Sequence, residues 1–96
     1  MRIVIKKVDQ KPVVKVVSGE LKELQEIVGG HIECIDVGDN ILCVCNEEGK
    51  LLGLRPNFIA RTNIICGDVF FCSKGYEDFE SLTDSQIVKL LNTFRY

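Results

Sequence analysis

Residues 28–60 read VGGHIECIDVGDNILCVCNEEGKLLGLRPNFIA, and this stretch decides the fold. Its spacing predicts a helix end at 28, strands over 31–37 and 41–45, and a hairpin turn at 46–49 that leads into a strand over 50–54. Gly29 suits the left-handed residue that ends many helices. A phosphate-binding glycine loop runs from a strand into a helix, whereas here a helix ends, so the glycine pair does not predict a phosphate site.

The residues before this stretch predict a hairpin and a helix. Residues 2–8 and 13–17 are rich in β-branched side chains, and Pro12 suits the turn or strand start between them. Ser18 is expected to cap a helix that continues to residue 28. The charged side chains of the hairpin are expected on a solvated outer face. They are Lys6, Lys7, Lys11 and Lys15.

The residues after this stretch predict another core strand and a second helix. Residues 64–73 resume strand character around a turn or bulge at Gly67-Asp68, and 74–80 form a polar connection. Thr83 and Gln86 have the spacing of a capping box before an apolar helical stripe. We therefore predict one compact α+β domain over 1–96, with two helices and a curved, mostly antiparallel sheet of about six short strands in the order β-β-α-β-β-β-β-α.

Charge, apolar runs and cysteine spacing argue against several classes of function. The net charge of −2 lacks the basic excess that tight, sequence-independent nucleic-acid binding needs. No apolar run reaches the length of a membrane span, and the N-terminus lacks the layout of a signal peptide, so a cytoplasmic location is predicted. The five cysteines include no C-x-x-C pair and are interpreted as buried thiols in a reducing compartment. Neither a metal nor a cofactor is predicted.

The segment from Arg55 to Asn63 is the best candidate site that the sequence offers. Interpreted as a loop, it carries two guanidinium groups, which can clamp a phosphate or carboxylate, and amides that can recognise polar groups. The competing interpretation is that Asn57 satisfies backbone groups while the arginines lie on the surface. The residues predicted to bind a ligand or partner are Arg55, Asn57, Arg61, Thr62 and Glu33.

Four motifs together resemble a known family. They are Val28-Gly29-Gly30-x-Ile32-Glu33, Asn46-Glu47-Glu48-Gly49, Asn57-x-x-Ala60 and Gly67-Asp68-Val69. From about Ile5 to Leu91 the chain resembles a family of small bacterial, plasmid and phage proteins classified as domain of unknown function number 3846. The resemblance implies a prokaryotic or viral setting, often among accessory genes of mobile elements, and no established activity.

These observations leave three hypotheses open. The first is a non-enzymatic binding protein of a phage or mobile element, in the cytoplasm of a bacterial or phage-infected cell, that acts on a host protein or sequesters a small, charged, nucleotide-like ligand. The second is a small metal-dependent hydrolase or nuclease-like enzyme that uses Glu33, Asp68 or His31. The third is a structural or regulatory subunit that self-associates through an exposed strand edge.

Overall fold

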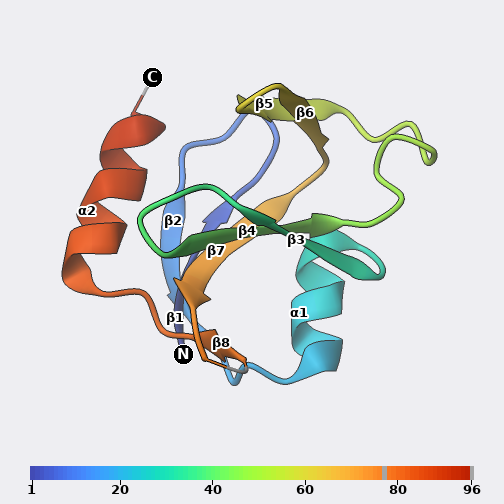
Figure 1. Ribbon diagram of the computed structural model, residues 1–96. Coiled ribbons are helices and arrows are strands. Elements are labelled where there is room, and N and C mark those ends of the chain that lie inside the picture. Colours follow the sequence, from blue (N-terminus) through green and yellow to red (C-terminus); the bar gives the residue numbers. More distant parts are fainter. Residues whose placement is uncertain (77, 96) are drawn as a thin grey trace.

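The computed structural model describes residues 1–76 and 78–95, and it has the predicted α+β class with two helices and mainly antiparallel strands (Figure 1). The elements are β1 (Arg2–Lys6), β2 (Val13–Val16), α1 (Leu21–Val28), β3 (Ile32–Asp36), β4 (Ile41–Asn46), β5 (Pro56–Ala60), β6 (Asn63–Cys66), β7 (Val69–Lys74), β8 (Phe79–Glu80) and α2 (Asp84–Thr93). The main sheet has the strand order β2-β1-β7-β4-β3, and β8 pairs with β7. Strands β5 and β6 form a separate antiparallel hairpin.

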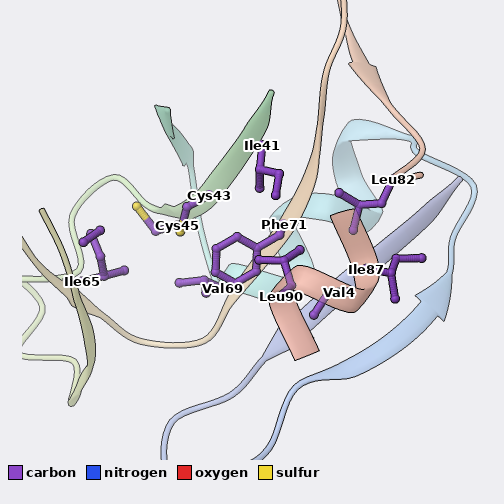
Figure 2. Close-up of a cluster of buried hydrophobic side chains, with 11 residues drawn as sticks. Val4, Ile41, Cys43, Cys45, Ile65, Val69, Phe71, Leu82, Ile87 and Leu90 are labelled. Carbon is purple, nitrogen blue, oxygen red and sulfur yellow. The ribbon is translucent and has the colours of Figure 1, made fainter. Parts of the chain in front are cut away.

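The main sheet is buried on both faces, so the core has two parts. Successive side chains of a strand point to opposite faces, which places Phe70 and Phe71 of β7 in different clusters. Phe70 packs with Leu24 and Val28 of α1 on one face. Phe71 lies in the second cluster, which covers the other face with side chains of α2 and of the β5–β6 hairpin (Figure 2). The two helices therefore lie on opposite sides of the sheet, as Figure 1 shows.

The helix termini confirm two predicted caps and correct a third. Thr83 and Gln86 form the expected capping box at the start of α2, and Gly29 ends α1 with a φ of 78°. Ser18 does not cap α1, because Gly19 has a φ of +87° and turns the chain before the helix begins at Leu21. Instead the backbone N–H and hydroxyl of Ser18 both donate to a carboxylate oxygen of Glu23.

Two segments differ from the sequence prediction. Residues 50–54 are a series of tight turns rather than a strand, because Gly53 takes a φ of +68° and Leu52 N–H bonds back to the Glu48 carbonyl. The predicted loop from Arg55 to Asn63 is mostly the hairpin of β5 and β6, in which Ile59 pairs with Ile64. This pairing joins apolar residues on both sides of a two-residue turn, which is the usual arrangement of a hairpin.

The remaining connection also contains more strand than predicted. Strand β7 continues to Lys74, and Phe79–Glu80 pairs with its end as β8. Residue 77 of the predicted connection, like residue 96, lies outside the described residues. Within residues 1–76 and 78–95, neither helix is long and apolar enough to cross a membrane.

Candidate functional site

The β5–β6 hairpin separates the two arginines of the predicted site. Arg55 precedes β5 and Arg61 follows it, so the five-residue strand holds them roughly 20 Å apart. The Arg55 guanidinium pairs with the Asp9 carboxylate at 2.5 Å, and both side chains are exposed. Arg61 and Thr62 form the hairpin tip, where both are exposed. The structure therefore does not bring Arg55 and Arg61 to a common site.

The side chain of Asn57 makes hydrogen bonds within the protein, as the competing interpretation of the sequence expected. Its amide nitrogen donates to the carbonyls of Lys6 and Gly67 at 2.8 and 2.9 Å. Its amide oxygen accepts from Lys6 Nζ at 3.1 Å. These three bonds tie the base of the hairpin to the end of β1 and to the turn before β7. Asn57 therefore fixes how the hairpin lies on the sheet.

A cleft lies between the hairpin and α2. Its volume is about 470 Å³, within the usual range of small-molecule sites. Three aromatic rings form much of its wall: Phe58 of β5, Phe71 of β7 and Phe94 at the end of α2. The Phe58 centroid lies 5.0 Å from that of Phe94 and 5.8 Å from that of Phe71. The Phe58 and Phe94 rings meet edge to face and the other two pairs are tilted, so the wall offers ring faces and edges against which another ring can pack.

Cationic groups surround the aromatic wall. Arg61 lines the rim from the hairpin tip, and Lys89 lines it from α2, where it pairs with Asp39. Among residues 1–76 and 78–95, Arg61 has no carboxylate within ion-pair distance. Its backbone has a φ of 57°, a left-handed conformation that costs a residue with a Cβ about 1 kcal/mol relative to glycine. Strained residues of this kind often occur where a side chain has a binding role.

Lys6 adds a third cation behind the ring of Phe94. The sequence placed Lys6 on a solvated face, but it is only 8% exposed because Asn57 and Phe94 cover the end of β1. Its Nζ donates to the Lys7 carbonyl at 2.7 Å and lies 6.0 Å from the Phe94 centroid. In the described part of the chain it has no carboxylate within 4 Å. The cleft thus lies beside a buried cation without an acidic partner, which favours an anionic ligand.

Glu33, the other predicted site residue, lies on the opposite side of the hairpin. It lines a smaller hollow of about 220 Å³ between β3, β6 and the turns after β4. Glu47 and Glu48 line the same hollow, so its charge is mainly acidic. Glu33 and Arg61 therefore serve separate hollows of opposite charge.

The residues considered for an enzyme do not share a hollow. Asp68 accepts the Val8 N–H at 2.9 Å and lies in the turn before β7, on the α1 side of the molecule. Glu33 lines the hollow beside β6, and exposed His31 precedes β3. Among the described residues, no three His, Cys, Asp or Glu side chains are placed to hold a metal ion.

Three cysteines pack as the sequence predicted, as buried thiols. Cys43 and Cys45 face the α2 side of the sheet, whereas Cys72 faces α1. Burial is the main cause that raises the pKa of Cys45 to about 11 and of Cys72 to about 12. The prediction of a buried thiol is wrong for Cys34, which is exposed on β3, and holds only in part for Cys66, which is half-buried. The buried thiols stay protonated at neutral pH, as inert packing groups do.

The structure adds site residues that the sequence reasoning did not propose. Lys89, Leu90 and Phe94 of α2 and Phe58 of β5 line the cleft. Leu90 and Phe94 belong to the apolar stripe predicted for the second helix, but a helical stripe cannot indicate that part of it borders a cleft. Phe58 lay in the segment interpreted as a loop, so no core or cleft role was predicted for it.

The fold and cleft define an α+β domain whose central antiparallel sheet carries α1 on one face and α2 with a hairpin on the other. The chain belongs to the family described as Domain of unknown function (DUF3846), whose model matches residues 1–95. Comparisons with the curated proteins and with the solved structures found no match for this chain.

Proposed function

We propose that this chain is a non-enzymatic binding protein, and that the cleft between α2 and the β5–β6 hairpin binds a small anion that carries an apolar ring. The observation that carries the proposal is the combination of an aromatic wall with Arg61 and Lys89 at its rim. A ring would pack on Phe58 and Phe94, while a phosphate, sulfonate or carboxylate would accept hydrogen bonds from Arg61. A nucleotide has both features, as the sequence-based hypothesis expected.

The sign of the ligand charge follows from the cations around the cleft. Arg61 and Lys6 have no carboxylate within ion-pair distance in the described residues, and Asp39 neutralises only Lys89. A guanidinium group can hold an anion with two parallel hydrogen bonds. Arg61 acts on the Asp36 carboxylate only from beyond ion-pair distance, so a cationic or neutral aromatic ligand would leave the guanidinium without a close anionic partner. We therefore expect anions to bind more tightly than neutral analogues of the same shape.

The proposal can be tested with two probes, 1-anilinonaphthalene-8-sulfonate and adenosine monophosphate. Fluorescence titration of the sulfonate and thermal shift with the nucleotide should both show saturable binding to the folded chain. Arg61→Gln should weaken binding about 10- to 150-fold, which corresponds to the loss of one hydrogen bond between charged groups. Arg55→Gln is the matched control, because Arg55 lies at the other end of β5 and pairs with Asp9. Equal loss in both variants, or no saturable binding to the native chain, would contradict the proposal.

A second pair of variants distinguishes the cleft from the acidic hollow. Lys6→Met keeps the length of the buried side chain and removes its charge, so it should weaken anion binding. Glu33→Gln changes the hollow beside β6 and should leave anion binding unchanged. A host protein as the partner, and a phage or mobile element as the source, remain predictions from the sequence.

A further inference from the structure

Strand β2 is an edge of the main sheet, and its apolar side chains are exposed. It pairs with β1 on one side only. Val13, Val14 and Val16 are 59%, 39% and 71% exposed. Exposed edge strands with β-branched side chains are templates for pairing with another strand, and proteins usually block them with charges or proline. Lys15 is the one charged residue within β2.

The hydrogen bonds at the start of β1 show which groups of β2 point outward. Met1 and Val17 exchange bonds in both directions, at 2.7 and 2.8 Å. Bonded and non-bonded pairs alternate along an antiparallel ladder, so Lys15 and Val13 also bond to β1, whereas Val14 and Val16 do not. The N–H and C=O groups of Val14 and Val16 therefore point away from the sheet.

The opposite side of β1 agrees with this register. Arg2 should direct its backbone groups away from β2, and its N–H indeed donates to Ser81 Oγ at 2.9 Å. Its carbonyl accepts from the Leu82 N–H at 3.0 Å.

Both ends of the β2 edge are closed. Pro12 is the next residue whose backbone would point outward, and proline has no N–H. At the other end the Ser18 N–H already donates to the Glu23 carboxylate at 2.7 Å. The edge thus offers two donors and two acceptors, from Val14 and Val16. This short window fits three residues of an incoming antiparallel strand.

The charge of this region selects the incoming strand. The first 17 residues hold five of the 12 basic residues of the chain and only one acidic residue, Asp9. Arg2 pairs with Asp84, and Lys15 shares a hollow with Glu23 and Glu26 of α1, so Lys15 is the cation that an incoming strand would meet directly. A second copy that used all four backbone groups would place its Lys15 directly opposite Lys15, a destabilising pair of like charges. An acidic residue at that position would instead form a favourable cross-strand pair. The edge therefore fits an acidic strand better than a second copy of itself.

We propose that β2 binds an extended acidic segment of a partner protein by antiparallel strand addition. The segment places a carboxylate opposite Lys15 and β-branched residues opposite Val14 and Val16. The acidic residue lies on the α1 side of the sheet, and its two neighbours lie on the α2 side. This interaction does not depend on the α2 cleft, since it uses the backbone of an edge strand on another part of the molecule.

Nuclear magnetic resonance of the full, ¹⁵N-labelled chain tests the proposal with the peptide acetyl-Thr-Val-Glu-Val-Thr-amide. In the free chain the amides of Val14 and Val16 should exchange with solvent rapidly, while those of Val13 and Lys15 are protected. Saturating peptide should protect Val14 and Val16 as well. N-methylation of both peptide valines, whose amides face β2, should abolish binding, whereas N-methylation of the glutamate should not. Equal effects of the two methylation patterns would overturn the proposed register.

Two variants of the protein complete the test. Val14→Pro removes one outward N–H but no bond to β1, so it should weaken peptide binding at least 10-fold with little change in melting temperature. Lys15→Glu should reverse the charge preference, so that a peptide with lysine in place of glutamate binds more tightly. Absence of binding by every peptide at millimolar concentration, or an unchanged preference in Lys15→Glu, would overturn the proposal. Sedimentation that shows dimers of the native chain, abolished by Val14→Pro, would assign the edge to self-association instead.

Discussion

The two hollows beside the β5–β6 hairpin share one supporting element but differ in size, lining and charge. The cleft on the α2 side holds about 470 Å³ and is lined by aromatic rings with cations at its rim. The hollow on the β3 side holds about 220 Å³ and is lined by three glutamates. The two sides of one hairpin therefore differ in charge, and under the proposed function an anion is expected on the α2 side.

The largest expected effect concerns the floor of the cleft, which is also part of the core. Phe71 is 1% exposed and packs against both Phe58 and Phe94. Phe71→Ala should lower the free energy of unfolding by about 3–5 kcal/mol, because it removes a buried ring and leaves a cavity. Ile59→Ala, on the outer face of the hairpin, should cost under about 0.5 kcal/mol. Urea denaturation measures both, and similar losses would mean that the hairpin packs through its other face.

The next effect concerns the hydrogen bonds that attach the β5–β6 hairpin to the end of β1 and to the turn before β7. Asn57→Ala removes three hydrogen bonds and leaves the buried Lys6 with one fewer partner. We expect a loss of about 1–3 kcal/mol in unfolding free energy. The control is Asn63→Ala, since Asn63 is exposed at the start of β6. A stable Asn57→Ala variant with unchanged amide spectra over 56–66 would show that the hairpin needs no such anchor.

A smaller effect of opposite sign is expected at the hairpin tip. Arg61→Gly relieves the left-handed conformation at φ 57°, which costs a residue with a Cβ roughly 1–2 kcal/mol. The greater freedom of glycine in the unfolded chain offsets part of this gain, so the fold should be stabilised by about 0.5–1 kcal/mol. The same change should weaken anion binding, because the guanidinium group is lost. Thermal unfolding and fluorescence titration together separate the two consequences. A variant that gained neither stability nor a binding defect would remove Arg61 from the account.

The smallest expected effect is a dependence on pH at the end of β3. The backbone N–H of Gly38 and the side chain of Lys74 both donate to Asp36 and lower the pKa of its carboxyl, and the nearby Arg61 contributes. A lowered pKa in the folded state contributes stability that is present above the unfolded pKa and is lost as the pH falls through the folded pKa. Asp36→Asn should therefore be less stable than the native chain at pH 7, with a difference that disappears in acid. A constant difference across the pH range would contradict this.

Local patterns predicted the elements whose signals lie within a few residues. The capping box at Thr83 and the left-handed Gly29 both hold in the structure. Ser18 failed as a cap because Gly19 turns the chain, and residues 50–54 failed as a strand because successive turns bond to one another. In both places a glycine with a positive φ allowed a turn that composition alone could not predict.

The candidate site was predicted less well, because it depends on contacts between distant segments. The segment around Arg55 and Arg61 was interpreted as a loop, in which both arginines could meet one ligand. Pairing of Ile59 with Ile64 makes it a hairpin and separates the two arginines. The cleft itself requires β5, β7 and α2 to meet, and nothing in the local sequence of Phe94 or Lys6 reveals that meeting.

The central claim is that the α2 cleft, and not the acidic hollow, binds a small anion that carries an apolar ring. The most direct test is to titrate the ¹⁵N-labelled chain with 1-anilinonaphthalene-8-sulfonate and to monitor the amide signals by nuclear magnetic resonance. We expect saturable shifts that are largest at Phe58, Ala60 and Arg61 and over 89–94, and that weaken in Arg61→Gln. Shifts that are largest at Glu33 and Ile64, or that increase linearly without saturation, would contradict it.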